Sequence, residues 1–252
     1  MRHRGEDMGC TSAELKRISR GQLTGHWGLA IGASLLSSLL VSAVLMPFYF
    51  LMAASRGGVV QSAAFFVAAF LVGMVSAVLE CGVLRMHLAF SRQQEADLKM
   101  LFGEFARRPE RYILSYLMVL GAAILCMLPG SVCILVGVEG GAALAGGIGL
   151  FLYFAGIAVL AALALRYSLA FLFLVEDSQM GVLEAFRESA HCMEGNKGRL
   201  LYICLSFFGM VLLGMLSCGI GMLWVTPYMN QVTVNFYQDV AGDGLSGHWQ
   251  AV

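Results

Sequence analysis

The residues best placed for chemistry are a few isolated charges at the edges of long apolar stretches. Glu80 precedes Arg85 by five positions, and Arg166 interrupts an otherwise apolar stretch over 140–175. An ionisable side chain inside a membrane segment is costly and usually has a role. Three interpretations of Arg166 are open. Its guanidinium reaches the lipid headgroups, forms an ion pair with Glu80, or binds an anionic substrate.

A second set of candidate residues lies in the last apolar segment, where Pro227, Tyr228 and Asn230 are followed by Gln231 and Asn235. Proline removes a backbone donor and tends to kink a helix. Amides within a membrane span usually hydrogen-bond to neighbouring helices. We therefore expect these residues to pack the bundle. The alternative is that a kinked, amide-rich helix lines a wet cavity or a groove for a partner.

Catalytic motifs do not stand out in the sequence, which has no H-E-x-x-H, no G-x-S-x-G and no P-loop. The seven cysteines form no C-x-x-C pair and show no zinc-ligand spacing with histidine. The five histidines lie near the termini or near predicted membrane interfaces, where we expect ordinary polar surface: His3, His26, His87, His191 and His248. We therefore predict no catalytic residue, no metal, no cofactor and no enzymatic activity.

The elements that position these residues are long uncharged segments. Hydrophobic residues make up 59% of the chain and charged residues only 13%, whereas soluble domains carry about 25% charged residues. Asp, Glu, Lys and Arg are absent from 21–55, 57–79, 112–138, 140–165 and 200–238. A membrane-spanning helix needs roughly 20 apolar residues. The last run is too long for one helix and is broken at 217–219. The sequence thus predicts an all-α polytopic membrane protein with about six spans.

The positive charges predict the orientation of the spans. Nearly all of the 16 lysines and arginines fall before the first run, between the second and third, or after the fourth. Basic residues near span ends mark the cytoplasmic side. We expect a protein of the inner cell membrane with both termini in the cytoplasm, and a flexible cytoplasmic tail over 241–252. The net charge of zero gives no sign of nucleic-acid binding.

Three similar units are predicted within this single membrane domain, over 11–92, 97–177 and 179–239. Residues 84–90 (LRMHLAF) resemble residues 165–171 (LRYSLAF). Each unit begins with an amphipathic stretch, as in the stripe of Leu98, Leu101, Phe102 and Phe105. We expect each stretch to form a helix on the inner leaflet that leads into a transmembrane hairpin. The alternative is that the short helices pack together as a small soluble cap.

Two sets of motifs resemble those of a bacterial membrane-protein family catalogued as domain of unknown function 975. Near the N-terminus they are Leu15-Lys16 and Gly25-His26-Trp27-Gly28, where His26 replaces an expected Asn. Near the C-terminus they include Ser189, Gly195-Asn196-Lys197, Leu205-Ser206-Phe207, Gly219-Ile220-Gly221, Trp224, Pro227-Tyr228 and Phe236-Tyr237. The resemblance covers most of the chain. It implies a fold and a location, but no catalytic residue.

The function expected from the sequence is therefore non-enzymatic. Amphipathic helices beside basic residues favour contact with anionic lipid. Small residues such as those over 141–147 favour close helix packing or self-association. We expect an accessory protein that binds membrane lipids or another membrane protein. The alternative is a transporter or channel for a small solute or peptide, with Arg166 near the inner end of its path.

Overall fold

The computed structural model describes residues 10–55 and 58–242, and every regular element within these ranges is a helix. The all-α prediction is confirmed for these residues. The predicted tail falls almost wholly outside them, since only Ala241 and Gly242 are described. The elements are α1 (Ser12–Leu23), α2 (Trp27–Ala54), α3 (Val59–Ser91), α4 (Lys99–Gly103), the 3-10 turn η1 (Glu104–Ala106), α5 (Glu110–Glu139), α6 (Ala143–Arg166), α7 (Ala170–Glu176), α8 (Val182–Cys192), α9 (Lys197–Leu216) and α10 (Met222–Ala241).

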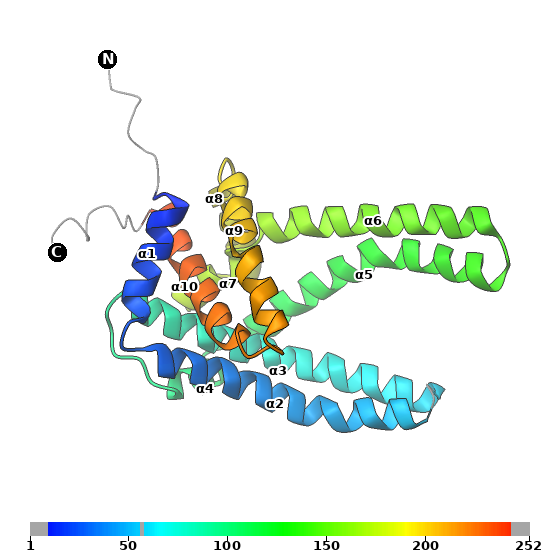
Figure 1. Cartoon of the computed structure of the whole chain (residues 1–252), viewed down its shortest axis with the longest axis horizontal. Coiled ribbons are helices and arrows are strands. Elements are labelled where there is room, and N and C mark those ends of the chain that lie inside the picture. The colour runs from blue at the N-terminus through cyan, green and yellow to red at the C-terminus, as the bar shows by residue number, and fades with distance from the viewer. Residues whose placement is uncertain (1–9, 56–57, 243–252) are drawn as a thin grey trace, which may run out of the picture.

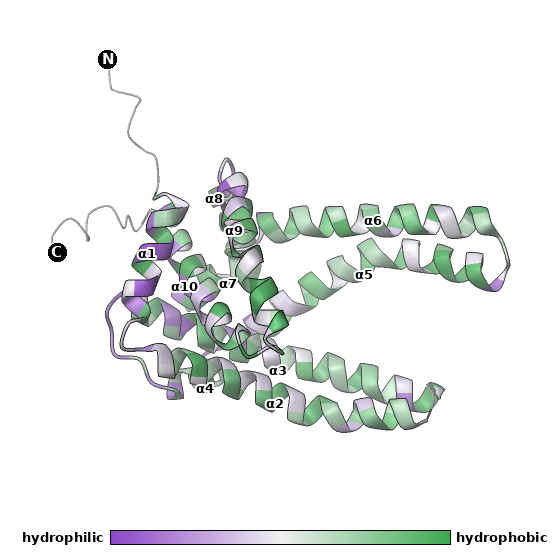
Figure 2. Ribbon diagram, viewed as in Figure 1, coloured by the Kyte–Doolittle hydropathy of each residue, from purple (hydrophilic) through white to green (hydrophobic). Residues whose placement is uncertain are grey.

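Two long arms give the molecule its shape. One arm pairs α2 with α3 and the other pairs α5 with α6, and the arms diverge from a common base (Figure 1). The helices α9 and α10 lie at this base, at a steep angle to the arms in this view. The arms are apolar along their length, whereas polar residues gather on α1, α8 and the loops of the base (Figure 2).

Five helical segments are long and apolar enough to cross a membrane: α2, α3, α5, α9 and the stretch Ala143–Glu176, which contains α6 and α7. Their outward surfaces expose large apolar side chains such as Phe66, Leu125 and Phe151. A water-soluble protein rarely exposes apolar surface on this scale. The fold is therefore that of a helical membrane protein. Helix α10 differs, because half of its residues are buried within the base.

Glycines bring α5 and α6 together. A Cβ built on Gly149 would lie 2.5 Å from the backbone nitrogen of Ile134, and one on Gly130 would lie 2.6 Å from that of Tyr153. No side chain fits at such distances, so the two backbones approach more closely than larger residues would permit. Gly137 and Gly156 meet the opposite backbone in the same way. The glycines thus serve packing within one arm.

The short helices α1 and α8 bury their apolar faces against the rest of the chain. Leu15 and Leu23 of α1 are fully buried in the core cluster that includes α10, and Ala185 of α8 and Met193, which caps the end of α8, belong to the same cluster. Helix α1 packs mainly on α10 and α8 mainly on α7, so both pack on protein, whereas the alternative drawn from the sequence had the short helices packing together as a cap. The second stretch differs, because Phe102 and Phe105 remain partly exposed, at 48% and 39%.

Side chains of α1 and of the residue before it stabilise this helix and its contact with α9. The hydroxyl of Thr11 accepts a hydrogen bond from the Glu14 backbone N–H at 3.3 Å, while the Glu14 carboxylate accepts one from the Thr11 N–H at 2.9 Å, which forms a capping box. These hydrogen bonds hold the pKa of Glu14 below its usual value. Lys16 donates to the Ser206 hydroxyl at 2.6 Å, and its partial burial lowers its pKa.

The three long hairpins begin in a similar way. In each hairpin, the residue just before the N-cap of the first helix has a positive φ. These residues are Gly25 (+91°), Arg108 (+69°) and Gly195 (+82°). The following N-caps are His26, Pro109 and Asn196. These turns agree with the idea of three related units, although the division into units stays a prediction.

Candidate functional site

Arg166 lies where the long apolar segment of α6 and α7 breaks. Helix α6 ends at Arg166 and α7 begins at Ala170. Ser189 of α8 bridges the break, because its hydroxyl accepts from the Leu169 N–H at 3.2 Å and donates to the Arg166 carbonyl at 3.2 Å. The backbone groups released by the break are thereby satisfied, as buried backbone groups must be. The same contacts fix α8 against the end of α6.

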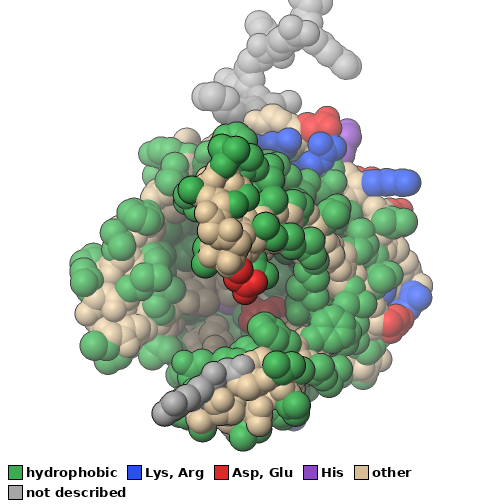
Figure 3. Space-filling view, turned by 90° about the vertical axis from the view of Figure 1, so that its right-hand side faces the viewer, with side chains coloured by type: hydrophobic (Ala, Val, Ile, Leu, Met, Phe, Trp, Pro, Cys, Tyr) green, Lys and Arg blue, Asp and Glu red, His purple; other side chains and the backbone are tan. Residues whose placement is uncertain are grey.

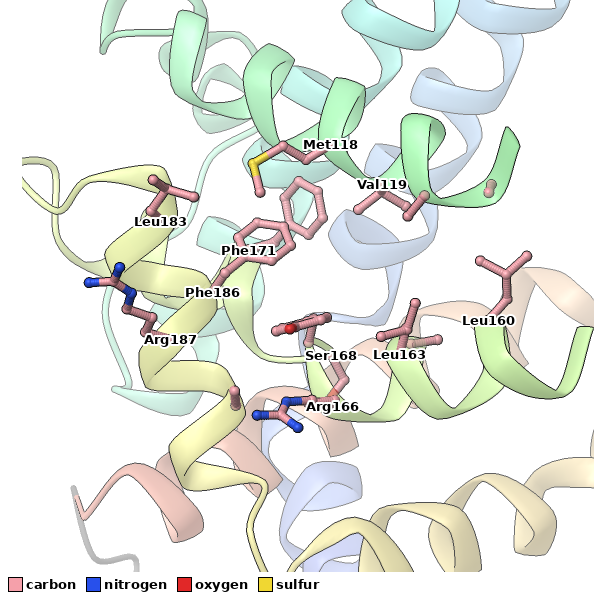
Figure 4. Close-up of a pocket in the computed structure, with 15 residues that line it drawn as sticks. Met118, Val119, Leu160, Leu163, Arg166, Ser168, Phe171, Leu183, Phe186 and Arg187 are labelled. Atoms are coloured by element: carbon pink, nitrogen blue, oxygen red, sulfur yellow. The ribbon is translucent and has the colours of Figure 1, made fainter. Parts of the chain in front are cut away.

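A groove opens beside this break. It has a volume of about 720 Å³ and is bounded by α5, α6, α7 and α8. Its walls are mainly aliphatic and aromatic, with Met118, Val119, Leu160, Leu163, Phe171, Leu183 and Phe186 among the lining side chains (Figure 4). The volume falls in the range of about 300–1,000 Å³ that is usual for small-ligand sites. The groove thus suits an apolar ligand of moderate size.

Two guanidinium groups give the groove a charged end. Arg166 and Arg187 lie at the end formed by α8, and Leu160 and Val119 lie toward the other end (Figure 4). Both arginines are exposed. Arg166 lies 5.9 Å from the centroid of the Tyr167 ring. Among the described residues, neither side chain has a carboxylate partner. The site is therefore cationic at one end and apolar at the other.

The ion pair with Glu80, one of the three interpretations of Arg166, is not formed among the described residues. Glu80 is exposed on α3, and within the described ranges it has no hydrogen bond or ion pair. Arg166 lies on the other arm. The arms diverge, so the two side chains belong to different surfaces. Seen from the tips of the arms, the molecule is hollowed between them, with one acidic side chain at the rim of the hollow and another deeper inside it (Figure 3).

Arg85 instead forms a buried cluster at the base of the arms. Its guanidinium pairs with Glu104 of η1 and donates to the Val175 carbonyl at 2.6 Å. The Tyr112 hydroxyl donates to the same Glu104 carboxylate at 2.5 Å. Glu104 and Tyr112 are both fully buried. The cluster joins α3, η1, α5 and α7, and its contacts indicate a structural role for Arg85.

Pro227 and Tyr228 are buried in α10, and Asn230 is half-buried. The Tyr228 hydroxyl accepts from the Arg20 Nε at 2.9 Å and donates to the Lys16 carbonyl at 3.2 Å. These contacts tie α10 to α1. They support the packing role expected for this set of residues.

The amides of α10 also face protein. Gln231 donates to the Gln22 side-chain oxygen at 2.8 Å, and Asn235 donates to the Ser19 hydroxyl at 2.7 Å. His87 is fully buried beside Gln231, with 2.8 Å between its Nδ1 and the Gln231 Oε1. The expectation that His87 belongs to the polar surface is therefore wrong. It is part of a buried polar network that joins α1, α3 and α10.

Sequence reasoning missed Glu104, Arg187 and Ser189 as members of sites. Arg187 lies on the exposed side of α8, and its place in the groove lining depends on the break in α6, where Ser189 holds α8 against the end of that helix. Glu104 follows Leu101 by three positions, so a helical register would place both on one face, and this signal could have indicated its burial. Within the described ranges, no group of three His, Cys, Asp or Glu residues could hold a metal ion.

Comparison with known proteins gives one match. A family model described as "Protein of unknown function (DUF975)" matches residues 8–243. No curated protein and no solved structure matches the chain. The match extends over all the helices from α1 to α10.

Proposed function

The chain belongs to the family described as protein of unknown function (DUF975), as its motifs predicted, and we propose that it is a non-enzymatic membrane protein that holds a lipid in the groove between α5 and α8. The observation that carries the proposal is the groove itself. Its apolar walls continue into the exposed apolar surface of the arm formed by α5 and α6. An acyl chain can enter such a groove sideways from the bilayer.

Binding accounts for the groove better than transport does. A transport path would need polar groups along its length to replace the hydration of a solute. The wall that leads from Arg166 toward Leu160 is apolar instead. Its aliphatic and aromatic side chains match an acyl chain and offer no acid–base chemistry. We therefore favour lipid binding over the transport alternative and over catalysis.

We further propose that the chain crosses the membrane six times, as three hairpins, with α1, α8 and the basic loops on the cytoplasmic side of the inner membrane. The sixth crossing is α10. Its C-terminal end returns to the start of α1, where the Cys10 N–H donates to the Asp239 carboxylate at 3.0 Å and Arg199 pairs with Asp239 at 2.5 Å. An even number of crossings leaves both termini on one side, in agreement with the basic residues of α1, α8 and the loops beside them.

Cysteine labelling tests this topology. In a variant that retains only Cys218, which is exposed in the turn between α9 and α10, a membrane-impermeant maleimide should react in intact cells. In a cysteine-free chain with Asp97→Cys, the same reagent should react only after the cells are permeabilised. Labelling of both positions from the same side would contradict six crossings. Permeabilised cells serve as the control for reactivity.

Gentle extraction tests the lipid-binding function. We expect the tagged protein to keep about one phospholipid per chain through purification, because a chain held in a groove exchanges more slowly than annular lipid. Mass spectrometry of the intact protein in micelles counts what is retained. A chain that carries no lipid, or one that carries a stoichiometric protein partner in its place, would contradict the proposal.

A further inference from the structure

We infer that the ligand of the groove is an anionic phospholipid, whose headgroup phosphate binds at the end of the groove that Arg166 and Arg187 line. This inference rests on the proposed function and deepens it, because it assigns the chemical class of the lipid. It depends on three features of the site: two arginines without carboxylate partners, the apolar groove that leads away from them, and their level in the membrane.

The donor groups of the two arginines suit a phosphate ligand. Arginine presents a planar set of donors that binds phosphate oxygens in a bidentate manner. Among the described residues, the acidic side chains of α8, Glu184 and Glu188, form no ion pair with either arginine. The Glu184 carboxylate accepts a hydrogen bond from the Gly181 N–H that precedes the helix. Arg166 and Arg187 are the charged residues of the groove lining among the described residues. The positive charge at this end therefore awaits an external anion.

A comparison within the chain strengthens this reading. Residues 84–90 and 165–171 are similar in sequence and place Arg85 and Arg166 at matching positions. Arg85 is neutralised by Glu104 and holds the Val175 carbonyl. Arg166 lacks such a carboxylate among the described residues. Arg85 thus has a structural role, whereas Arg166 is left to line the groove.

The apolar part of the site requires more than a free anion. From Arg166 to Leu160 the groove follows α6 for about 9 Å, at 1.5 Å per residue. Met118 and Val119 of α5 line the opposite side. Inorganic phosphate would leave this surface unoccupied, whereas a phospholipid places its acyl chain there. The combination of a cationic end and an apolar end is that of an amphiphile with an anionic head.

The depth of Arg166 in the membrane agrees with this assignment. Helix α6 has 24 residues from the tip of its arm to Arg166, or about 36 Å. The hydrocarbon core is about 30 Å thick. If the tip lies near the outer interface, Arg166 lies at the level of the inner headgroups. Basic pockets between helices on this side bind the headgroups of anionic lipids.

Competition between defined lipids tests the inference. Delipidated protein in micelles is titrated with phosphatidylglycerol or with phosphatidylcholine of the same acyl chains, and bound lipid is counted by native mass spectrometry. We expect the wild type to prefer phosphatidylglycerol about tenfold or more, given roughly 1 kcal/mol for each basic residue near a charged headgroup. The Arg166→Gln/Arg187→Gln variant should lose this preference.

A charge-matched control separates the site from general attraction. Arg107 and Lys197 are exposed basic residues outside the groove lining, and the Arg107→Gln/Lys197→Gln variant should keep the wild-type preference. Equal preference in the wild type and the Arg166/Arg187 variant would overturn the inference, as would displacement of phosphatidylglycerol by millimolar inorganic phosphate. Equal, tight binding of both lipids by the wild type would overturn the inference while leaving the proposed function intact. Binding of neither lipid would overturn both.

Discussion

Glu104→Ala should destabilise the protein by about 3–5 kcal/mol, because it leaves the Arg85 guanidinium in a buried cluster without its carboxylate. The Tyr112 hydroxyl would lose its acceptor as well. Arg85 also holds the Val175 carbonyl at the end of α7, so α7 should loosen where Phe171 lines the groove. The free energy of unfolding, measured by titration with a denaturing detergent in mixed micelles, gives the size of the effect.

The exposed pair of Arg108 and Glu110 provides the control for this prediction. Its side chains are 54% and 63% exposed, whereas that of Glu104 is 0% exposed. Exposed ion pairs contribute about 0–1 kcal/mol, so Glu110→Ala should change the stability little. Replacement of the buried pair by Arg85→Met and Glu104→Leu together should recover much of the loss. Equal effects of Glu104→Ala and Glu110→Ala would show that the buried cluster does not hold the base.

Gly149→Ala should destabilise the arm formed by α5 and α6 by about 1–3 kcal/mol, which is the usual cost of overpacking. The added methyl group would lie 2.5 Å from the Ile134 backbone nitrogen, and a backbone cannot rotate away as a side chain can. The two helices would have to separate. Thermal unfolding in micelles, followed by the loss of monodisperse protein, measures the effect.

Gly147 is the matched control, because it lies on the same helix with nothing within 4 Å of an added Cβ. Gly147→Ala should be neutral, or stabilising by up to about 1 kcal/mol, since alanine loses less backbone entropy than glycine in a helix. If the two variants had the same melting temperature, close backbone contact between α5 and α6 would be refuted.

Much of the fold could be predicted because local signals and hydropathy determine it. The capping box of Thr11 and Glu14 and the turn at 217–219 are both encoded by neighbouring residues, and both are present in the structure. The amides of α10 were expected to pack against other helices, and Gln231 and Asn235 do so. These features depend on residue types whose environment varies little between proteins.

The site was less predictable because it depends on contacts between distant segments. Residues 84–90 and 165–171 are similar, yet α3 continues through the first while α6 ends within the second. The difference lies in Ser189, which bonds the broken backbone from α8. The burial of His87 likewise depends on Gln231, which is far away in the chain. The burial of Glu104 depends on Arg85 and Tyr112, which lie on the helices α3 and α5 and not on its own 3-10 turn. Helical periodicity alone can place such residues on one face of a helix, but it does not identify the segment that covers that face.

Lipid retained by a groove-filling variant, counted by native mass spectrometry, tests the lipid-binding function most directly. Ala164 lines the groove, whereas Ala162 of the same helix is exposed outside it. Ala164→Trp should fill the groove and lose the bound phospholipid, while Ala162→Trp should keep about one per chain. Equal retention by both variants would contradict the assignment of the lipid to the groove between α5 and α8.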